Sequence, residues 1–408
     1  MLPAIADALK IMLECVTPIA RAELVSLSGA LGRILAADVA ALRDLPPYDN
    51  SAMDGYAVKL TDAGKAVKVA GAIFAGDEPN AEVSEGSAVK IMTGAMIPNG
   101  AEAVVMVEDT RILEGGLARL PEKIAADQHI RFAGEEIKEG AALFAKGDRI
   151  TPAVGALLAS QGITETRVFA PLKAAIISSG NEIVEAGVAA KAHQIYNTNA
   201  AALSLALKEA GFEPRYFGIS PDDPARLAEI LSRAFAECDA VLTTGGVSVG
   251  EADFTIKAFE AIGAEIFFHG LNFKPGKPTM AGAVLGKPFF ALPGNPLSGA
   301  ANLYLLVLPA LAKLQGGKMF YPNFVLARLA SDLAVKGDRQ NAILGRFKSG
   351  EWSAARGGKY GSGMMTPLCE ADSFAVFCGA KTYERGSIVK VLPIPCDLSD
   401  NEADFVNK

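Results

Sequence analysis

Strand patterns and helix patterns alternate through the middle of the chain, and this rhythm limits the available folds more than any other feature. Short apolar runs predict β-strands at 174–178, 215–219, 240–244, 265–268 and 287–292. Amphipathic or apolar stretches predict helices at 199–210, 224–237, 254–262 and 297–314. A strand, a helix and a further strand in succession are typical of a parallel sheet covered by helices on both faces. Residues 171–318 are therefore predicted to form a doubly wound, mostly parallel α/β domain.

The segments on either side of this region predict smaller domains. Residues 3–15 have the spacing of an amphipathic helix, and Thr151-Pro152 begins another helix that stops at Gly162. Between these helices, short apolar runs predict strands at 66–70, 88–92 and 103–107. Strand patterns return at 324–329, 343–347, 373–377 and 387–392. The expected domains are a helical linker domain (1–46 plus 138–170), an inserted β-domain (47–137), the α/β domain (171–318) and a C-terminal β-domain (319–408).

Charge and composition exclude several classes of function. A formal net charge of −7 leaves no basic excess for a general nucleic-acid binder. The five cysteines lack CxxC spacing, and the three histidines (His129, His193, His269) are too scattered to support a zinc site or a Ser-His pair. The N-terminal segment has no basic start typical of a signal peptide, and the apolar run 303–311 is too short to cross a membrane. These features predict a soluble, cytoplasmic protein that does not bind membranes.

Polar loops follow the strands of the expected α/β domain, at the carboxyl ends where such sheets bind ligands. They are Ser-Ser-Gly-Asn-Glu (178–182), Thr-Gly-Gly-Val-Ser-Val-Gly-Glu-Ala-Asp (244–253), Asn-Phe-Lys-Pro-Gly-Lys (272–277) and Leu-Pro-Gly-Asn-Pro-Leu-Ser (292–298). Together they offer backbone N–H groups, hydroxyls, lysines and the carboxylates of Glu182, Glu251 and Asp253. Those are the groups that hold a polyphosphate and a magnesium ion.

Each loop also has an ordinary structural interpretation. The Gly-Gly pair can be a tight turn, Asp253 can be the N-cap of the next helix, and the lysines can be solvated charges. No Walker A, GxGxxG, HExxH or GxSxG pattern occurs. The recurrence of polar loops at successive strand ends favours a phosphate site over isolated turns.

A second group of polar residues lies in the N-terminal half. Residues 46–57, Pro-Pro-Tyr-Asp-Asn-Ser-Ala-Met-Asp-Gly-Tyr-Ala, form an exposed, constrained loop by composition, which alone indicates an ordinary linker. Together with Thr-Gly-Ala (93–95), residues 100–110, the strand-end loops and Lys-Pro-Gly-Lys-Pro (274–278), this loop completes an ordered set of motifs. The set resembles the molybdopterin molybdenumtransferase family, which includes the E domain of gephyrin, over nearly the full chain.

The resemblance implies an elongated multidomain subunit, a homodimer, and a substrate in which AMP is joined to molybdopterin through a pyrophosphate. It implies that molybdate enters the dithiolene and that AMP is released with Mg²⁺ as cofactor. The positions that match the family's functional acids and hydroxyl are Asp54, Thr93, Glu182 and Asp253, which we expect to be catalytic. Glu182 and Asp253 are also the expected metal ligands. The expected substrate-binding residues are Gly245, Gly246, Ser248, Lys274, Lys277, Asn295, Ser298 and Glu136. Asp54 and Thr93 belong to another domain and would act across a cleft, from the same or the other subunit.

The chain departs from the family pattern at two places. Gly134-Glu-Glu136 stands where the family usually has Gly-Glu-Asp, which keeps the carboxylate. Leu344 stands where the family's second arginine is expected in the C-terminal domain, unless Arg346 reaches the site instead. Three alternatives remain open: a paralogue that uses tungstate, a non-catalytic scaffold that binds molybdopterin, and a molybdopterin adenylyltransferase.

Overall fold

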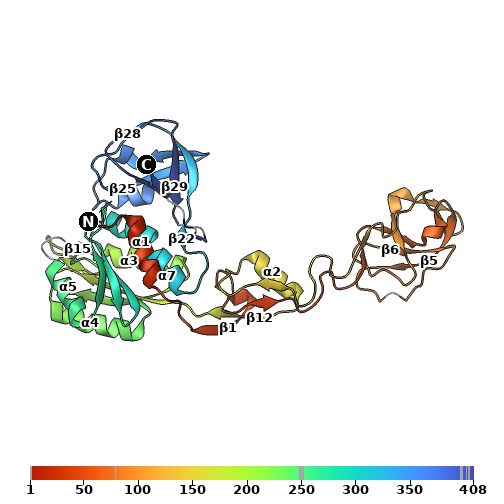
Figure 1. Ribbon diagram of the computed structural model, residues 1–408, viewed down its shortest axis with the longest axis horizontal. Coiled ribbons are helices and arrows are strands. Elements are labelled where there is room, and N and C mark those ends of the chain that lie inside the picture. The colour runs from red at the N-terminus through yellow and green to blue at the C-terminus, as the bar shows by residue number, and fades with distance from the viewer. Residues whose placement is uncertain (1, 79, 248–251, 396–397, 401, 403–404) are drawn as a thin grey trace. The chain divides into compact units, whose positions relative to one another are not determined.

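The computed structural model describes residues 2–78, 80–247, 252–395, 398–400, 402 and 405–408 (Figure 1). The contacts within the chain divide it into two compact units. The core unit contains residues 1–37, 146–155 and 165–408, and the inserted unit contains residues 38–145 and 156–164. Each unit has its own sheet and its own hydrophobic core.

A six-stranded sheet in the order β16-β13-β17-β21-β20-β18 forms the centre of the core unit. Its strands are β13 (Lys173–Ser179), β16 (Glu213–Ser220), β17 (Ala240–Thr244), β18 (Glu265–His269), β20 (Met280–Val284) and β21 (Lys287–Leu292). The first four strands in the sheet order are parallel to one another, which confirms the predicted α/β fold. β20 is antiparallel to both of its neighbours and has no counterpart among the predicted strands. Its residues, Met-Ala-Gly-Ala-Val, are mostly small and have weak strand propensity.

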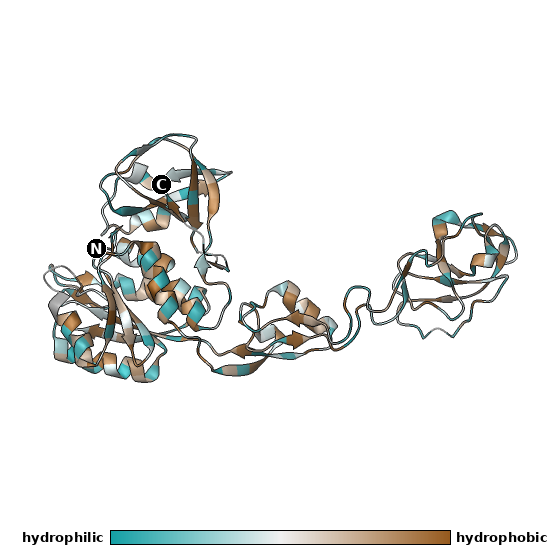
Figure 2. Ribbon diagram, in the orientation of Figure 1, coloured by the Kyte–Doolittle hydropathy of each residue, from teal (hydrophilic) through white to brown (hydrophobic). Residues whose placement is uncertain are grey.

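Helices cover both faces of this sheet. They are α3 (Thr198–Glu209), α4 (Pro224–Glu237), α5 (Ala252–Ala261), α6 (Pro296–Asn302) and α7 (Leu308–Leu314), with a π-helical turn at Leu303–Val307. Alternate residues of β13 point to opposite faces: Ile176 packs in the cluster that contains α3 and α6, and Ile177 in the cluster that contains α4 and α5. Hydrophilic residues gather on the outer side of α4 (Figure 2). The layers therefore follow from two-residue and 3.6-residue periodicities in the sequence.

The helical stretch Pro296–Leu314 is long and apolar enough to cross a membrane, by length and composition. However, 83% of its most apolar window is buried inside the protein, as expected for a core helix. It is the only such stretch among the residues that the structure describes.

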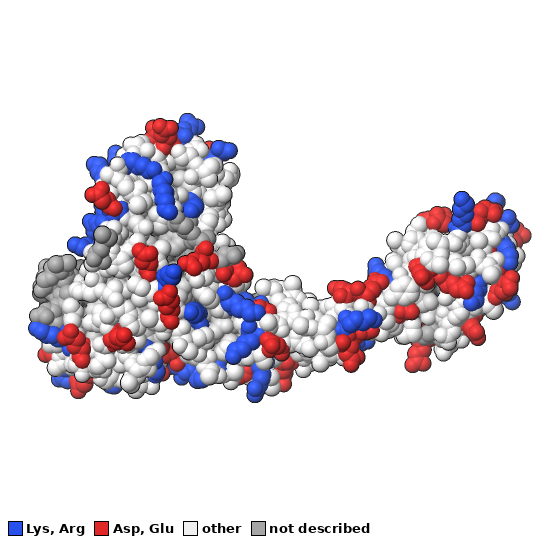
Figure 3. All heavy atoms as spheres, in the orientation of Figure 1, with Lys and Arg blue, Asp and Glu red and all other residues white. Residues whose placement is uncertain are grey.

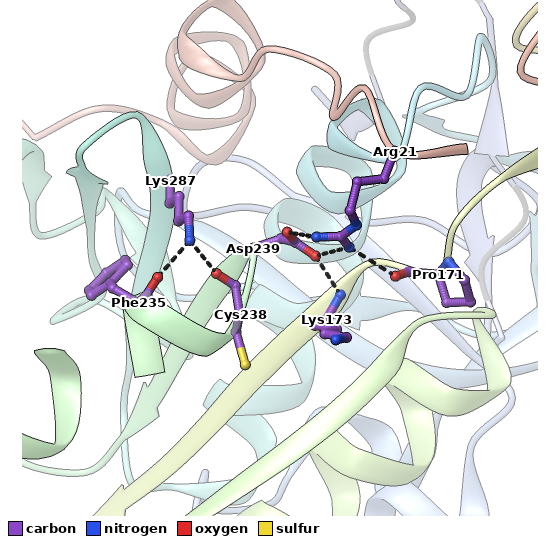
Figure 4. A network of polar contacts seen from close by, with 7 residues as sticks. All are labelled: Arg21, Pro171, Lys173, Phe235, Cys238, Asp239 and Lys287. Carbon is purple, nitrogen blue, oxygen red and sulfur yellow. Dashed lines mark hydrogen bonds and ion pairs between the residues drawn. The ribbon is translucent and has the colours of Figure 1, made fainter. Parts of the chain in front are cut away.

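A polar network joins the N-terminal ends of β13 and β17 to the segment that contains Arg21 (Figure 4). Arg21 donates to both oxygens of Asp239 at 2.7 and 2.8 Å, and the backbone N–H of Lys173 donates to Asp239 Oδ2 at 2.8 Å. Lys287 Nζ donates to the carbonyls of Phe235 and Cys238, at the C-terminal end of α4, at 2.6 and 2.9 Å. A cation at a helix C-terminus is stabilising because the last carbonyls have no intrahelical partner.

A closed β-barrel makes up the C-terminal part of the core unit. Its strands are β23 (Val325–Leu329), β25 (Gln340–Lys348), β26 (Glu351–Ala354), β27 (Ser373–Phe377) and β29 (Ile388–Pro393). Pairing runs around the ring β25-β26-β23-β29-β27 and closes between β27 and β25. β19 (Phe273–Lys274) and β31 (Val406–Asn407) extend the same sheet, and α8 (Thr366–Glu370) precedes β27. The barrel confirms the predicted C-terminal β-domain.

The core unit also contains one more helix and several short strands. They are α1 (Ile5–Cys15), β1 (Ala22–Ser26), β12 (Glu165–Phe169), β14 (Ile183–Val184), β15 (Ile195–Tyr196), β22 (Tyr321–Pro322), β24 (Leu333–Ala334), β28 (Thr382–Tyr383) and β30 (Leu398–Ser399). α1 packs its apolar face into the main cluster, as the spacing of residues 3–15 predicts. Thr151 Oγ1 accepts from Val154 N at 3.3 Å at the start of α2 (Pro152–Ser160), so this helix begins where the sequence predicts.

The inserted unit contains a second six-stranded sheet in the order β7-β4-β6-β5-β9-β8. Its strands are β4 (Gly55–Val58), β5 (Ala66–Ile73), β6 (Ser87–Ile91), β7 (Ala103–Met106), β8 (Arg111–Leu113) and β9 (Leu117–Arg119). Short pairs add β2 (Val39–Ala40) to β11 (Ala142–Phe144) and β3 (Asn50–Ser51) to β10 (Ile130–Arg131). β5, β6 and β7 coincide with the strands expected from the sequence.

The turn between β20 and β21 offers a test of local strain. Leu285 has φ +50°, is 96% exposed and is followed by Gly286 at φ +77° in a two-residue hairpin loop. Such loops favour Asn-Gly, because asparagine adopts positive φ more readily than leucine. Leu285→Asn is therefore expected to raise the free energy of unfolding by about 0.5–1 kcal/mol. Urea unfolding measures the change, and Leu285→Ala, which keeps the strain, should leave stability near the wild-type value.

Candidate functional site

The site is built at the carboxyl edge of the core-unit sheet, where β13 and β17 end side by side. The connection after β13 leads to α3 on one face, and the connection after β17 leads to α5 on the other face. Such a switch point opens a crevice between the two strands, which is where open α/β sheets bind ligands. Gly245 N donates to Leu292 O at 3.1 Å, so the end of β21 is tied to the same place.

Gly245 can only be glycine in this backbone. It has φ +90°, and a Cβ there would lie 2.1 Å from the carbonyl oxygen of Ser179. Because this neighbour is backbone, no rotamer change could relieve the clash. The loop after β17 therefore lies directly against the end of β13.

Gly246 continues this loop in front of α5. A Cβ on Gly246, at φ +68°, would lie 2.4 Å from Phe254 Cζ and 2.8 Å from Ser179 Oγ. Thr255 Oγ1 donates to Gly246 O at 2.7 Å, which fixes the loop on the first turns of α5. Ser179 is 2% exposed, and its hydroxyl has no hydrogen-bond partner among the described residues. An unsatisfied hydroxyl beside a glycine loop at a helix N-terminus is suited to an anion.

Two expected site residues fall partly or wholly outside what the structure describes. Ser248 lies outside the described residues, as does the neighbouring Glu251. The backbone of Asp253 is in the first turn of α5, but its side chain is not described.

Carboxylates gather on the loops after β13 and β16. Glu182 folds back over the loop, so that a Cβ on Gly180 would lie 2.7 Å from Glu182 Oε2. Asn181 N donates to Asp222 Oδ2, and Asp222 N donates to Asn181 Oδ1, both at 3.4 Å. Asp222 therefore joins the predicted Glu182 at this edge. Asp222 was not among the predicted site residues, although it follows the end of β16 at Ser220 by two residues.

A chain of hydrogen bonds fixes the segment that carries Glu182. Ser178 Oγ donates to Asn197 Oδ1 at 2.9 Å, and Asn197 Nδ2 donates to Tyr216 Oη at 2.7 Å. Tyr216 donates in turn to Glu185. Burial and the hydrogen bond to Glu185 raise the pKa of Tyr216 above its ordinary value, so the phenol stays a donor at neutral pH.

Hydrogen bonds fix the backbone of residues 272–277, the loop that carries Lys274 and Lys277 and is called the basic loop below. Leu271 N donates to Lys277 O at 2.7 Å, and Thr279 Oγ1 donates to Gly276 O at 2.8 Å. Lys274 lies in β19 and pairs with Asn341 of the barrel. Both lysine side chains are exposed, and neither has an ion-pair partner in the described part of the chain. A fixed backbone thus presents two free ammonium groups.

The segment that precedes α8 contacts the N-terminus of α6. Asn295 Nδ2 donates to Ser362 Oγ at 3.0 Å, and Leu297 N donates to Ser362 O at 3.2 Å. Asn295 is exposed at the edge, whereas Ser298 is 3% exposed and lies one turn farther along α6. Of these two expected substrate-binding residues, the structure thus brings only Asn295 to the surface of the site.

The barrel supplies no cation at position 344. Leu344 is fully buried in the main hydrophobic cluster, and its N–H donates to Tyr360 Oη at 2.6 Å. Burial raises the pKa of Tyr360 to about 12, so the phenol remains neutral. Arg346 lies two residues farther along β25 and donates from Nε to Glu370 O at 2.6 Å.

Asp54 and Thr93 are brought together in the inserted unit. Asp54 Oδ1 accepts from the backbone N–H of Thr93 at 2.7 Å and from Thr93 Oγ1 at 2.7 Å. These bonds, the backbone one first, lower the pKa of the Asp54 carboxyl. Both residues are exposed, as is Glu136, whose N–H donates to Leu45 O at 3.0 Å. The turn therefore presents an ionised, oriented carboxylate.

Thr93→Val tests this arrangement. The variant removes the hydroxyl bond and keeps the backbone bond, so the pKa of Asp54 is expected to rise only part of the way to its ordinary value. Any activity that needs ionised Asp54 would then begin to fall, as the pH is lowered, at a higher pH than in the wild type. NMR titration of the carboxyl carbon measures the pKa. Thr110→Val, which removes a hydroxyl bonded to Met106 O, should leave it unchanged.

The described residues hold no group of three or more His, Cys, Asp or Glu side chains that could bind a metal ion. Carboxylate oxygens, such as those that Glu182 and Asp222 carry, are the kind of ligand that Mg²⁺ takes together with substrate phosphates. Acidic and basic side chains are interspersed on the face in Figure 3, without a large basic patch.

Comparisons with known proteins cover most of the chain. The families "MoeA N-terminal region (domain I and II)", "Probable molybdopterin binding domain" and "MoeA C-terminal region (domain IV)" match residues 4–162, 175–313 and 326–394. Molybdopterin molybdenumtransferase of Haemophilus influenzae is 37% identical over 383 residues, which are 92% of this chain and 94% of that protein. The protein of the same name from Nostoc sp. is 33% identical over 388 residues, 91% of this chain and 89% of its own length.

A solved structure has the same fold over nearly the same length. The molybdopterin biosynthesis moeA protein from Pyrococcus horikoshii OT3 matches with a TM-score of 0.84 at 31% identity. The match covers 96% of this chain and 99% of that one.

Proposed function

Because this chain belongs to the molybdopterin molybdenumtransferase family and is an enzyme of molybdenum cofactor biosynthesis, we propose that it inserts molybdate into adenylylated molybdopterin and releases AMP. The observation that carries this proposal is the arrangement at the carboxyl edge of the sheet. The glycine loop with the unpartnered Ser179 hydroxyl, the free ammonium groups of Lys274 and Lys277, and the carboxylates of Glu182 and Asp222 share this edge. A pyrophosphate with its counter-ions is the ligand that this set of groups would hold.

The reaction opens the phosphoanhydride between AMP and the pterin's phosphate arm. Water adds to one phosphorus, the bridging P–O bond breaks, and each product keeps one phosphate. Negative charge grows on the leaving phosphate in the transition state, where Lys274 and Lys277 would neutralise it. Backbone N–H groups at the start of α5 would orient the other phosphate. Molybdate, also a dianion, would use the same basic loop.

Glu182 and Asp222, with Asp253, are the residues that would hold Mg²⁺. The ion would supply charge neutralisation for the pyrophosphate when bound. We further propose that Asp54 and Thr93, with Glu136, act on the same substrate and that the enzyme is a cytoplasmic homodimer, as the family resemblance implies. In this proposal Asp54 orients a water or the reacting phosphate as an ionised acceptor.

One assay tests the proposal. Purified protein is incubated with adenylylated molybdopterin, Mg²⁺ and either molybdate or tungstate, and AMP is followed by chromatography. We expect AMP release that depends on the oxyanion and on Mg²⁺. Absence of AMP with both oxyanions would contradict the enzymatic proposal and support a scaffold. Formation of the adenylylated pterin from ATP would support an adenylyltransferase instead.

A further inference from the structure

Three segments that lie far apart in the sequence meet where the basic loop begins. Asn272 N donates to Pro3 O at 2.8 Å, and Gln340 N donates to Asn272 O at 3.2 Å. Gln340 Oε1 in turn accepts from Ile5 N at 3.0 Å. Because Pro3 and Ile5 are only two residues apart in the chain, these three hydrogen bonds form a closed ring. The ring joins the start of α1, the basic loop and the first residue of β25.

Gln340 satisfies a donor that α1 does not satisfy locally. Ile5 is the first residue of α1, where the backbone N–H has no acceptor within the helix. Ala4 occupies the N-cap position and provides no side-chain hydrogen bond. The side chain of Gln340, 335 residues farther along the chain, supplies this acceptor instead. An apolar residue at position 340 would therefore remove the only side-chain bond of the ring.

The ring holds the segment that carries both lysines. Phe273 and Lys274 form β19 directly after Asn272, and β19 pairs in parallel with the first two residues of β25. Phe273 is fully buried in the main hydrophobic cluster. Leu271 N donates to Lys277 O at 2.7 Å, so Lys277 is tied to the residue before Asn272. A displacement of Asn272 would therefore move both ammonium groups.

An apolar contact supports the same junction. Leu2 lies against Gly270, where an added Cβ would be 3.0 Å from Leu2 Cδ2. Gly270 N donates to Thr279 O at 2.8 Å, which joins the two ends of the segment that contains the basic loop. Residues 2–5 thus contact this segment through both apolar and polar groups.

We propose that Gln340 is a positioning residue, which closes the ring and so holds Lys274 and Lys277 in place for the anionic part of the substrate. The inference rests on the proposed function and gives the barrel a role in the site, although the barrel has no cation at position 344. A loop that is ordered before binding does not have to be ordered at the expense of binding free energy, so the ring raises the affinity for the anion. Gln340 acts through the lysines.

Gln340→Leu tests the proposal, because it removes the acceptor and keeps a side chain of similar size. Its affinity for inorganic pyrophosphate, measured by calorimetry, is expected to fall about three- to tenfold, the change that corresponds to the net worth of one hydrogen bond. Hydrogen exchange measured by mass spectrometry should become faster in residues 270–279. Gln128→Leu is the matched control, since Gln128 Oε1 accepts from Ala125 N at 3.1 Å in the inserted unit. It should change neither measurement.

A double-mutant cycle with Lys274→Ala separates positioning from a purely structural role. If Gln340 acts through the lysines, the fold-loss of pyrophosphate affinity caused by Gln340→Leu should be at most about half as large in the Lys274→Ala background. A purely structural role would lower the thermal midpoint without this coupling. Equal fold-losses in the two backgrounds would therefore contradict the inference.

Wild-type pyrophosphate affinity in Gln340→Leu would overturn the inference, as would a loss of affinity without faster exchange in residues 270–279. Failure of the wild type to bind pyrophosphate would overturn it as well. The proposed function is judged separately, from AMP release by the wild type. If the wild type releases AMP and Gln340→Leu binds pyrophosphate normally, only the positioning role is wrong. If no AMP is released but the expected binding pattern is found, the positioning role stands and the proposed function fails.

Discussion

Replacement of both Lys274 and Lys277 by alanine is expected to lower the rate of AMP release by about 10²–10³-fold or more. The loop backbone is fixed by Gly276 and Thr279, and both ammonium groups are without an ion-pair partner among the described residues. Their charge is thus free for the leaving phosphate, and the transition state would lose this stabilisation in the variant. Quenched-flow measurement of AMP gives the rate.

The charge and the shape of the lysines can be separated. Lys274→Arg with Lys277→Arg keeps the charge, so it should recover part of the rate; Arg binds phosphate through a planar fork and Lys as a point charge. Lys208→Ala removes an exposed lysine from the last turn of α3 and should leave the rate unchanged. A double alanine variant with wild-type AMP release would remove the basic loop from the proposed mechanism.

Gly245→Ala should have the largest effect on stability of any single substitution considered. The new Cβ would lie 2.1 Å from a backbone oxygen of β13 at a residue with φ +90°, so the end of β17 or of β13 has to move. We expect a loss of at least about 3 kcal/mol in the free energy of unfolding, the sum of positive-φ strain and backbone displacement. Urea unfolding measures it.

Gly263→Ala is the matched control for that change. Gly263 also has positive φ, at +76°, but an added Cβ would meet nothing within 4 Å. Its cost should be about 1–2 kcal/mol from strain alone. Equal losses in the two variants would mean that the close approach of Gly245 to Ser179 does not matter.

The local periodicities of the sequence were enough for much of the fold. The strands at 240–244 and 287–292 and the helix at 224–237 match β17, β21 and α4, because each has a clear apolar pattern and clear ends. β20 was missed because its small residues have no strand signature of their own. It forms a strand because its backbone groups pair with β18 on one side and with β21 on the other.

The candidate site divides in the same way. The glycines, the lysines and Glu182 at the strand ends could be predicted from the sequence, because turn and loop residues are recognised from their immediate neighbours in the chain. Only the tertiary structure brought Asp222 beside Asn181, set the Ser179 hydroxyl without a partner, and placed Ser298 and Leu344 inside the core. The physical reason is that burial and hydrogen-bond partners depend on contacts between residues far apart in the chain. These contacts cannot be predicted from the apolar periodicity of a single strand or helix.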